Sequence, residues 1–242
     1  MTKILEVNNV FKSFGSKKVH RGVSFYLNQG ETIGLLGPSG TGKSVLLRSI
    51  IGLEEIDEGE ITFHQERIDN LAEEELYQIR TKISYAFQSG ALFDSDSVFE
   101  NVAYPLFEHT KLSELEIEKK VLEVLKIVNM EGAQDLMPSD LSGGMQKRVG
   151  LARAMILNPE ILLYDEPTAG LDPANIEVVI DIMNKFKGQG ISGILVTHDI
   201  STALKICDRI LILKDGVINF NGTIYEFENS TDSFVKTFLK YE

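Results

Sequence analysis

Residues 32–52 constrain the fold more than any other part of the chain. The apolar run Thr32–Leu36 leads directly into the glycine-rich segment Gly37–Ser44, and a stretch with helical spacing follows from Ser44 to Gly52. A short apolar run bounded by a glycine turn is typical of a buried strand. A glycine-rich turn between a strand and a helix can present backbone N–H groups to an anion, with the helix dipole behind them. We therefore expect an α/β protein built on a mainly parallel sheet.

The glycine-rich segment has the spacing G-x-x-x-x-G-K-S, which assigns a role to its side chains. Lys43 would reach the β- and γ-phosphates of a nucleotide, and the Ser44 hydroxyl would coordinate Mg²⁺. A turn that matches this pattern by accident is the alternative, and the strand before it and the helix after it argue against that. We expect a nucleotide to be held by Gly37, Pro38, Ser39, Gly40, Thr41, Gly42, Lys43, Ser44 and Val45.

Further strands and helices are expected on both sides of a helical region. Strands are predicted at Ile4–Val10, Val23–Leu27, Glu60–Phe63, Ile83–Phe87, Ile161–Tyr164, Gly193–Thr197, Ile210–Leu213 and Val217–Phe220. Helices are predicted at Glu73–Arg80, Ala174–Lys187 and Ser201–Cys207, and residues 221–242 are expected to end in one helix.

Residues 89–158 are predicted to be a helical insertion in this core. Ser113 and Glu116 form a capping box, the residues after it have helical spacing, and a second helix starts near Ser142 after Pro138. We therefore expect one domain over 1–242, with an α/β core and β subdomain in 1–88 and 159–242.

A pair of carboxylates follows the apolar run Ile161–Tyr164. Asp165 is placed to hold the hydration shell of Mg²⁺, and Glu166, one residue on, to polarise an attacking water. An acidic turn at the end of a strand would be the simpler interpretation if no phosphate loop were present. Beside such a loop, we expect a metal ligand and a general base.

Two further polar residues follow predicted strands. His198 comes after Gly193–Thr197, and Gln88 comes after Ile83–Phe87. Parallel strands present their C-terminal ends on the same edge of a sheet. We therefore expect His198 near Asp165 and the γ-phosphate, and Gln88 in reach of Mg²⁺ or the attacking water. A structural histidine and a solvated glutamine are the alternatives.

The segment Leu141-Ser142-Gly143-Gly144-Met145 opens the second helix of the insertion. Its serine and glycines can present N–H groups to an anion at a helix start. From these residues alone, an ordinary Ser-Gly helix cap is favoured, because the chain already has one phosphate loop.

Composition excludes several classes of function. The net charge of −12 argues against non-specific nucleic-acid binding. The sequence contains no apolar run of the roughly 20 residues that a membrane-spanning helix needs. The single cysteine, Cys207, leaves no intrachain disulfide, so a cytoplasmic location is expected.

Across its whole length the chain resembles the ATP-binding subunit of ABC transporters. The motifs of that family occur in order, with a phosphate loop (Walker A) at Gly37–Ser44, Gln88, a signature at Leu141–Met145, Walker B at Ile161–Glu166, a D-loop at Gly170–Asp172, and His198. The resemblance implies a P-loop NTPase fold: a RecA-like parallel-sheet core, an N-terminal antiparallel β subdomain and an inserted helical subdomain.

The same resemblance implies how the protein works. Two copies would pair head to tail, and each ATP would lie between the Walker A loop of one copy and Leu141–Met145 of the other. Glu166 would be the general base and His198 would sense the γ-phosphate. Phe14 would stack on adenine, and Asp172 would belong to the nucleotide site. Closure would be transmitted through the Gln88 loop and the helical insertion to integral-membrane permease subunits.

Residues 89–106 resemble the Mla-type phospholipid transporter ATPases, as does the methionine at position 145. This resemblance implies phospholipid as the cargo, a lipid-binding protein in the same system, and a place on the inner face of the inner membrane. An ABC transporter for amino acids or metals, or for lipoprotein release, is the alternative. A soluble ABC-type ATPase is disfavoured, because such chains carry two cassettes or long coiled coils. The signature and His198 disfavour an unrelated P-loop kinase or GTPase.

Overall fold

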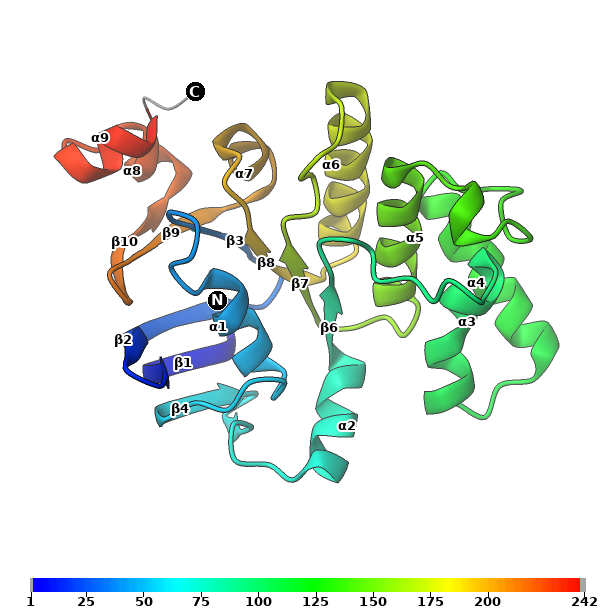
Figure 1. The fold of residues 1–242 in the computed structure, drawn as a ribbon, viewed down its shortest axis with the longest axis horizontal. Helices are drawn as coiled ribbons and strands as arrows, with labels where there is room; N and C mark the ends of the chain where they lie inside the picture. Colours follow the sequence, from blue (N-terminus) through cyan, green and yellow to red (C-terminus); the bar gives the residue numbers. More distant parts are fainter. Residues whose placement is uncertain (1, 240–242) are drawn as a thin grey trace.

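The computed structural model describes residues 2–239, without the side chain of Thr237, and two β-sheets organise this part of the chain (Figure 1). The larger sheet has the order β10-β9-β3-β8-β7-β6, and only β10 is antiparallel to its neighbour. Its strands are β3 (Thr32–Leu36), β6 (Ile83–Ala86), β7 (Ile161–Asp165), β8 (Ser192–Val196), β9 (Arg209–Lys214) and β10 (Val217–Thr223). The expected mainly parallel core is confirmed.

The smaller sheet is antiparallel and has the order β2-β1-β4-β5. Its strands are β1 (Lys3–Phe14), β2 (Lys17–Asn28), β4 (Glu58–Phe63) and β5 (Glu66–Arg67). The first two are longer than predicted, because they pair with each other through several register shifts. The two-residue β5 was not predicted. It follows a turn in which His64 and Gln65 both have positive φ, so the chain reverses without a glycine.

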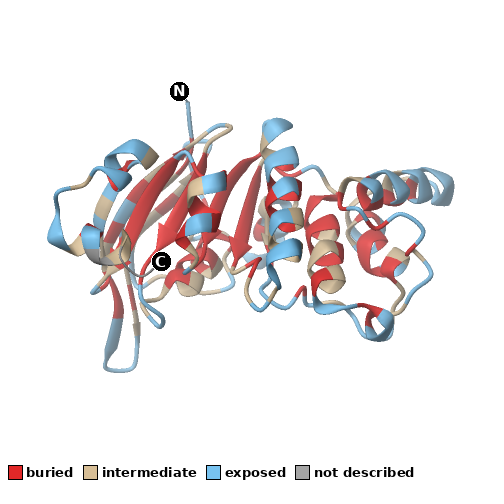
Figure 2. Ribbon diagram, turned by 90° about the horizontal axis from the view of Figure 1, so that it is seen from above, coloured by how far each residue is buried: buried red, intermediate tan, exposed pale blue. Residues whose placement is uncertain are grey.

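Successive side chains of the central strands point to opposite faces of the sheet, and this divides the hydrophobic core into two layers. Ile161 and Leu163 of β7 pack with the antiparallel sheet and with α1 (Lys43–Ile50), while Leu162 and Tyr164 pack on the opposite layer. That opposite layer includes α6 (Pro173–Gly188) and α7 (Ile200–Ile206). Because both faces are covered, the strands are buried, as Figure 2 shows.

Helices replace strands between β6 and β7, as predicted. They are α3 (Val98–His109), α4 (Glu114–Ile127) and α5 (Gly143–Met155), with a 3₁₀ turn at Pro138–Asp140, and they stand together beside the sheet in Figure 1. Before them, α2 (Glu73–Lys82) leads directly into β6.

The prediction of one helix at the C-terminus was wrong for the described residues, which form α8 (Ile224–Glu228) and α9 (Ser233–Leu239). Each has its own N-terminal acceptor: the Thr223 hydroxyl accepts from Glu226 N, and the Asp232 carboxylate accepts from Phe234 N. Two caps nine residues apart make two short helices. Residues 240–242 lie outside the described residues. Within 2–239, no helix combines the length and apolar character needed to cross a bilayer.

Candidate nucleotide-binding and hydrolysis site

The phosphate loop joins β3 to α1, as the sequence predicts. Gly37 has φ 153°, and a Cβ at this position would lie 2.3 Å from the carbonyl oxygen of Leu213, so a side chain has no room here. The Lys43 ammonium donates to the carbonyl oxygens of Gly37 (2.8 Å) and Pro38 (3.1 Å). The Lys43 ammonium is therefore held inside the phosphate loop by carbonyl oxygens of the same loop.

Burial lowers the pKa of Lys43, and the carboxylates of Glu166 and Asp165 oppose that shift. The residue is only 8% exposed, so its charge is partly stripped of water. A cation with little water around it attracts an incoming anion more strongly than a solvated one does. This environment suits the lysine to phosphate binding.

Asp165 is held through both of its carboxylate oxygens. The Ser44 hydroxyl donates to Oδ1 at 2.8 Å, and the Tyr85 hydroxyl donates to Oδ2 at 2.7 Å. Burial, followed by the bond to Asp165, raises the pKa of Tyr85, so its hydroxyl stays protonated. The serine and aspartate oxygens are of the kind that Mg²⁺ prefers and come from the two predicted positions, so these residues fit the ion.

Glu166 follows Asp165 with a left-handed backbone (φ 51°) that non-glycine residues rarely adopt. Its N–H donates to the carbonyl of Val196 at 2.9 Å, which fixes this turn against the end of β8. Its carboxylate Oε2 lies 2.8 Å from Nδ1 of His198. The two strand ends thus bring His198 to Glu166, whereas the parallel-edge argument predicts it near Asp165, one residue earlier.

The signature segment lies on a different part of the molecule. Ser142 is the N-cap of α5, and its hydroxyl accepts from Met145 N at 3.3 Å. Ser142 and Gly143 are exposed, whereas Leu141 is buried. In Figure 1, α5 and α1 stand on opposite sides of β6 and β7. The first turn of α5 is therefore a second, separate site at which N–H groups face outward.

Lys147, one turn into α5, ties this helix to the turn after β7. Its ammonium donates to the carbonyl oxygens of Ala169 and, at 3.4 Å, of Glu166. Burial lowers the pKa of Lys147, while the Glu166 carboxylate opposes the shift. Asp172 ends the same turn as N-cap of α6, where hydrogen bonds from Asn175 lower the pKa of its carboxyl.

The two remaining predicted residues are exposed. Gln88 lies in the turn after β6, beyond Phe87, which the sequence predicts as the last strand residue but which lies outside the strand. Phe14 ends β1 and is 45% exposed, with the Lys12 ammonium 4.8 Å from its ring centre. An exposed ring beside a cation suits stacking on a base.

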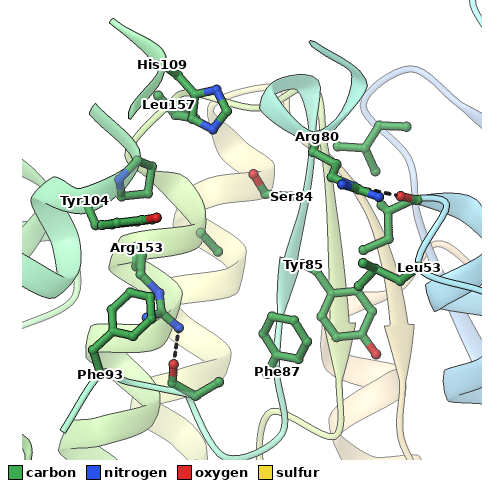
Figure 3. A pocket seen from close by; sticks show the side chains of 15 residues that line it. Leu53, Arg80, Ser84, Tyr85, Phe87, Phe93, Tyr104, His109, Arg153 and Leu157 are labelled. Atoms are coloured by element: carbon green, nitrogen blue, oxygen red, sulfur yellow. Dashed lines mark hydrogen bonds between the residues drawn. The ribbon is translucent and has the colours of Figure 1, made fainter. Parts of the chain in front are cut away.

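A groove of about 430 Å³ separates the sheet from the helices (Figure 3). Phe87 and Tyr85 lie on its sheet side, and Phe93 and Tyr104 face them from the helical side. Phe93 and Tyr104 pack edge to face, 5.1 Å apart. The exposed fractions of Phe87, Phe93 and Tyr104 lie between 42% and 44%, so the groove is an open aromatic surface.

Two polar side chains, one buried and one half-buried, shape the loop between Gln88 and α3. Asn101 is fully buried, accepts from Phe93 N at 2.8 Å, and donates to the carbonyl oxygens of Phe93, Asp96 and Ser97. Arg153 of α5 donates to the carbonyl oxygens of Gly90 (2.8 Å) and Ala91 (2.6 Å). The loop is therefore bound to the helix that carries the signature.

His20 is a further residue of the site that sequence reasoning missed. It lies on β2 at 1% exposure, with Nε2 3.1 Å from the carbonyl oxygen of Gly42 in the phosphate loop. Gly42 has φ 96°, and a Cβ there would lie 2.3 Å from Val19 and 2.9 Å from His20. No sequence signal singled it out, because His20 stands beside Val19 and Arg21 and lies before the predicted strand Val23–Leu27.

The fold and this site define a P-loop nucleoside triphosphatase. A model of the ABC transporter family matches residues 20–169. The chain is 42% identical over 253 residues to the chloroplastic protein TRIGALACTOSYLDIACYLGLYCEROL 3 of Arabidopsis thaliana, across 97% of this chain and 73% of that protein. It is 38% identical to the intermembrane phospholipid transport system ATP-binding protein MlaF of Haemophilus influenzae, across 99% of this chain and 91% of that protein.

Among solved structures, a dimeric ATP-binding cassette in a post-hydrolysis state, bound to ADP and Pi, superposes with a TM-score of 0.85. It is 34% identical in sequence and covers 91% of this chain and 99% of its own. The chain therefore belongs to the ABC transporter family, in which it is an ATP-hydrolysing cassette.

Proposed function

We propose that two copies of this chain close head to tail on ATP and Mg²⁺ and power a membrane permease that moves phospholipid between membranes. The observation that carries the proposal is the cluster of Lys43, Ser44, Asp165, Glu166 and His198 at one sheet edge. The similarity to an intermembrane phospholipid transport ATPase over 99% of the chain supports the cargo.

Within one copy, Lys43 and the N–H groups of Gly37–Ser44 would hold the β- and γ-phosphates. Ser44 and Asp165 would hold the metal, and their hydrogen bond of 2.8 Å shows that the two groups already face each other. Bound there, Mg²⁺ supplies positive charge that offsets the charge on the phosphate oxygens. Gln88 would contribute to this site from its exposed turn.

Glu166 would accept the proton of the attacking water. A general base must be positioned as well as basic. His198 supplies that positioning, because Nδ1–H donates to the carboxylate and leaves Nε2 free. The side chain of Glu166 is 16% exposed and that of His198 is 69% exposed, so the histidine is the more accessible of the two to a bound γ-phosphate.

The separation of Ser142 from the phosphate loop supports pairing of two copies. The first turn of α5 offers N–H groups that this copy's own loop does not use, and such groups favour an anion. A second copy would place them on its partner's γ-phosphate. Asp172 would lie at the same interface, and Phe14 would stack on adenine.

The aromatic groove is the surface that we assign to the permease. It lies between the larger sheet, whose edge carries Asp165 and Glu166, and α5, whose first turn belongs to the signature. The Gln88 loop joins the two, since Arg153 binds its continuation at Gly90 and Ala91. Movement of a permease segment in the groove would therefore displace both parts of the ATP site, the phosphate-loop edge and the signature segment. A permease docked in the groove would hold the chain on the cytoplasmic face of the inner membrane.

Co-purification with the membrane subunit tests the partner. A tagged chain extracted with mild detergent should retain a multi-spanning protein, and Tyr104→Glu in the groove should release it. Tyr225→Glu is the matched control, because Tyr225 is 75% exposed on α8 and does not line the groove. Retention by the Tyr104 variant would remove the groove from the proposal. Co-purification with nucleic acid is not expected.

Lipid transfer tests the cargo. The purified complex, together with its lipid-binding partner protein, should move a fluorescent phospholipid between vesicles only with ATP and Mg²⁺, and Glu166→Gln should stop it. An ATPase stimulated instead by an amino acid, a metal ion or a lipoprotein would support the alternative transporter classes. An ATPase that never binds a permease would indicate a soluble ABC-type protein.

A further inference from the structure

Tyr85 connects the aromatic groove to the metal-binding edge of the site. It is the third residue of β6, which lies next to β7 in the sheet. Its ring lines the groove, where it packs on Phe87 with ring centres 4.5 Å apart. Its hydroxyl donates to Oδ2 of Asp165 at 2.7 Å. One side chain therefore touches both the surface assigned to the permease and the carboxylate assigned to the metal.

Figure 3 shows the two rings side by side, with the phenol oxygen directed away from Phe93 and Tyr104 across the groove. The ring is accessible to a groove ligand from one side, while the hydroxyl is bonded to Asp165. A displacement of the ring would thus move the oxygen that bonds to Asp165.

The bond to Asp165 also selects which oxygen faces the serine. A carboxylate rotates between equivalent orientations unless both oxygens have fixed partners. With Oδ2 held by Tyr85, Oδ1 is left toward Ser44 at 2.8 Å. Ligands held in place before the ion arrives bind it with a smaller loss of side-chain entropy.

We propose that Tyr85 is a positioning residue that presents Asp165 to Mg²⁺ and makes this presentation sensitive to what occupies the groove. The proposal rests on the assignment of Asp165 as a metal ligand under the proposed function. It requires neither a phospholipid cargo nor a particular permease.

Tyr85→Phe tests the proposal by removing a single oxygen atom. ATP affinity is measured with a fluorescent ATP analogue, first in EDTA and then against increasing Mg²⁺. We expect unchanged affinity in EDTA and a Mg²⁺ midpoint raised about tenfold, the effect of one hydrogen bond to a charged group. Tyr77→Phe is the matched control: Tyr77 also donates one hydrogen bond, to the carbonyl of Glu108 at 3.1 Å, and lies on α2 outside the groove.

Phe87→Ala then tests the link to the groove. It keeps the Tyr85 hydroxyl but removes the ring that packs on it, and we expect a raised Mg²⁺ midpoint that is smaller than that of Tyr85→Phe. If Tyr85→Phe does not fold, Tyr85→Met, which lacks both the hydroxyl and the ring, is measured in its place, and a rise in its Mg²⁺ midpoint above that of Phe87→Ala is the effect of the lost hydroxyl.

Several outcomes would overturn the proposal. They are a Mg²⁺ midpoint that Tyr85→Phe leaves unchanged or lowers, an equal rise in Tyr77→Phe, or no effect of Phe87→Ala. Failure of the proposed function looks different, because wild-type protein and Asp165→Asn would then show the same Mg²⁺ dependence of binding.

Discussion

Nδ1 of His198 lies 2.8 Å from Oε2 of Glu166, although 32 residues separate them in the chain. The contact depends on the order of the sheet, in which β7 and β8 are parallel neighbours that end at the same edge. The left-handed backbone of Glu166 turns its carboxylate toward that edge. A histidine that orients a carboxylate can assist proton transfer without taking the proton itself.

We predict that His198→Ala keeps ATP binding but lowers the rate of ATP hydrolysis about a hundredfold, within the range expected for disturbed general-base catalysis. Phosphate release and binding of a fluorescent ATP analogue measure the two properties separately. His64→Ala is the matched control, because it breaks another histidine–glutamate pair, with Glu160 at 2.6 Å, on the exposed surface. Equal activity in the two variants would contradict the assigned role.

Lys43→Ala is expected to abolish nucleotide binding. The ammonium is the cation at the centre of the loop, and its removal leaves the carbonyl oxygens of Gly37 and Pro38 facing the phosphates. Titration calorimetry with ATP and Mg²⁺ checks this, with the exposed Lys18→Ala as control. Binding at wild-type affinity would refute the phosphate-loop assignment.

His20 is expected to support the phosphate loop through its bond to Gly42. His20→Leu should weaken ATP binding about fivefold, the effect of one neutral hydrogen bond, whereas His20→Gln, which can still donate from Nε2, should remain close to wild type. Equal affinities for the two variants would show that the bond to Gly42 does not matter for binding.

His20 also predicts a pH dependence of folding. Burial is the main cause of its lowered pKa, so the histidine is neutral in the folded protein and gains a proton more readily when unfolded. Stability is therefore complete above the unfolded pKa of 6.5 and falls as pH drops toward the native pKa. Urea unfolding should show wild type losing up to about 1.4 kcal/mol per pH unit more than His20→Gln in that window. If the free energies of unfolding of wild type and His20→Gln change equally with pH, the prediction is contradicted.

Asn101→Ala should lower the free energy of unfolding by about 2–4 kcal/mol, because it removes a fully buried amide that makes four hydrogen bonds to the backbone of the loop. Urea denaturation measures it, with the exposed Asn219→Ala as control. A loss no larger than that of the control would show that the loop is held by other contacts.

The parts of the fold that could be predicted from sequence rest on local signals. The strand Thr32–Leu36 was predicted with the bounds that β3 has, because an apolar run and a glycine turn mark both ends. The capping box at Ser113 and Glu116 is also confirmed, with Ser113 N donating to the Glu116 carboxylate at 2.8 Å. In contrast, no separate bounds were predicted for α3 within the helical region expected over residues 89–158.

The contacts that complete the site are long-range, and no local pattern encodes them. Tyr85 meets Asp165 across 80 residues, and His20 meets Gly42 across 22. From sequence, Tyr85 looks like an ordinary strand residue and His20 lies outside any predicted strand, so neither points to the site until the sheets are assembled. Motif spacing located Lys43 and Glu166, but only tertiary packing identified the side chains that position them.

Light scattering of Glu166→Gln tests most directly whether ATP closes two copies of this chain. Without the general base, ATP should persist between the phosphate loop of one copy and Ser142 of the other. With saturating ATP and Mg²⁺, we predict a particle of twice the mass of the 27.0 kDa chain, and a monomer when Lys43→Ala is added. A Glu166→Gln variant that binds ATP and remains monomeric would contradict the head-to-tail mechanism.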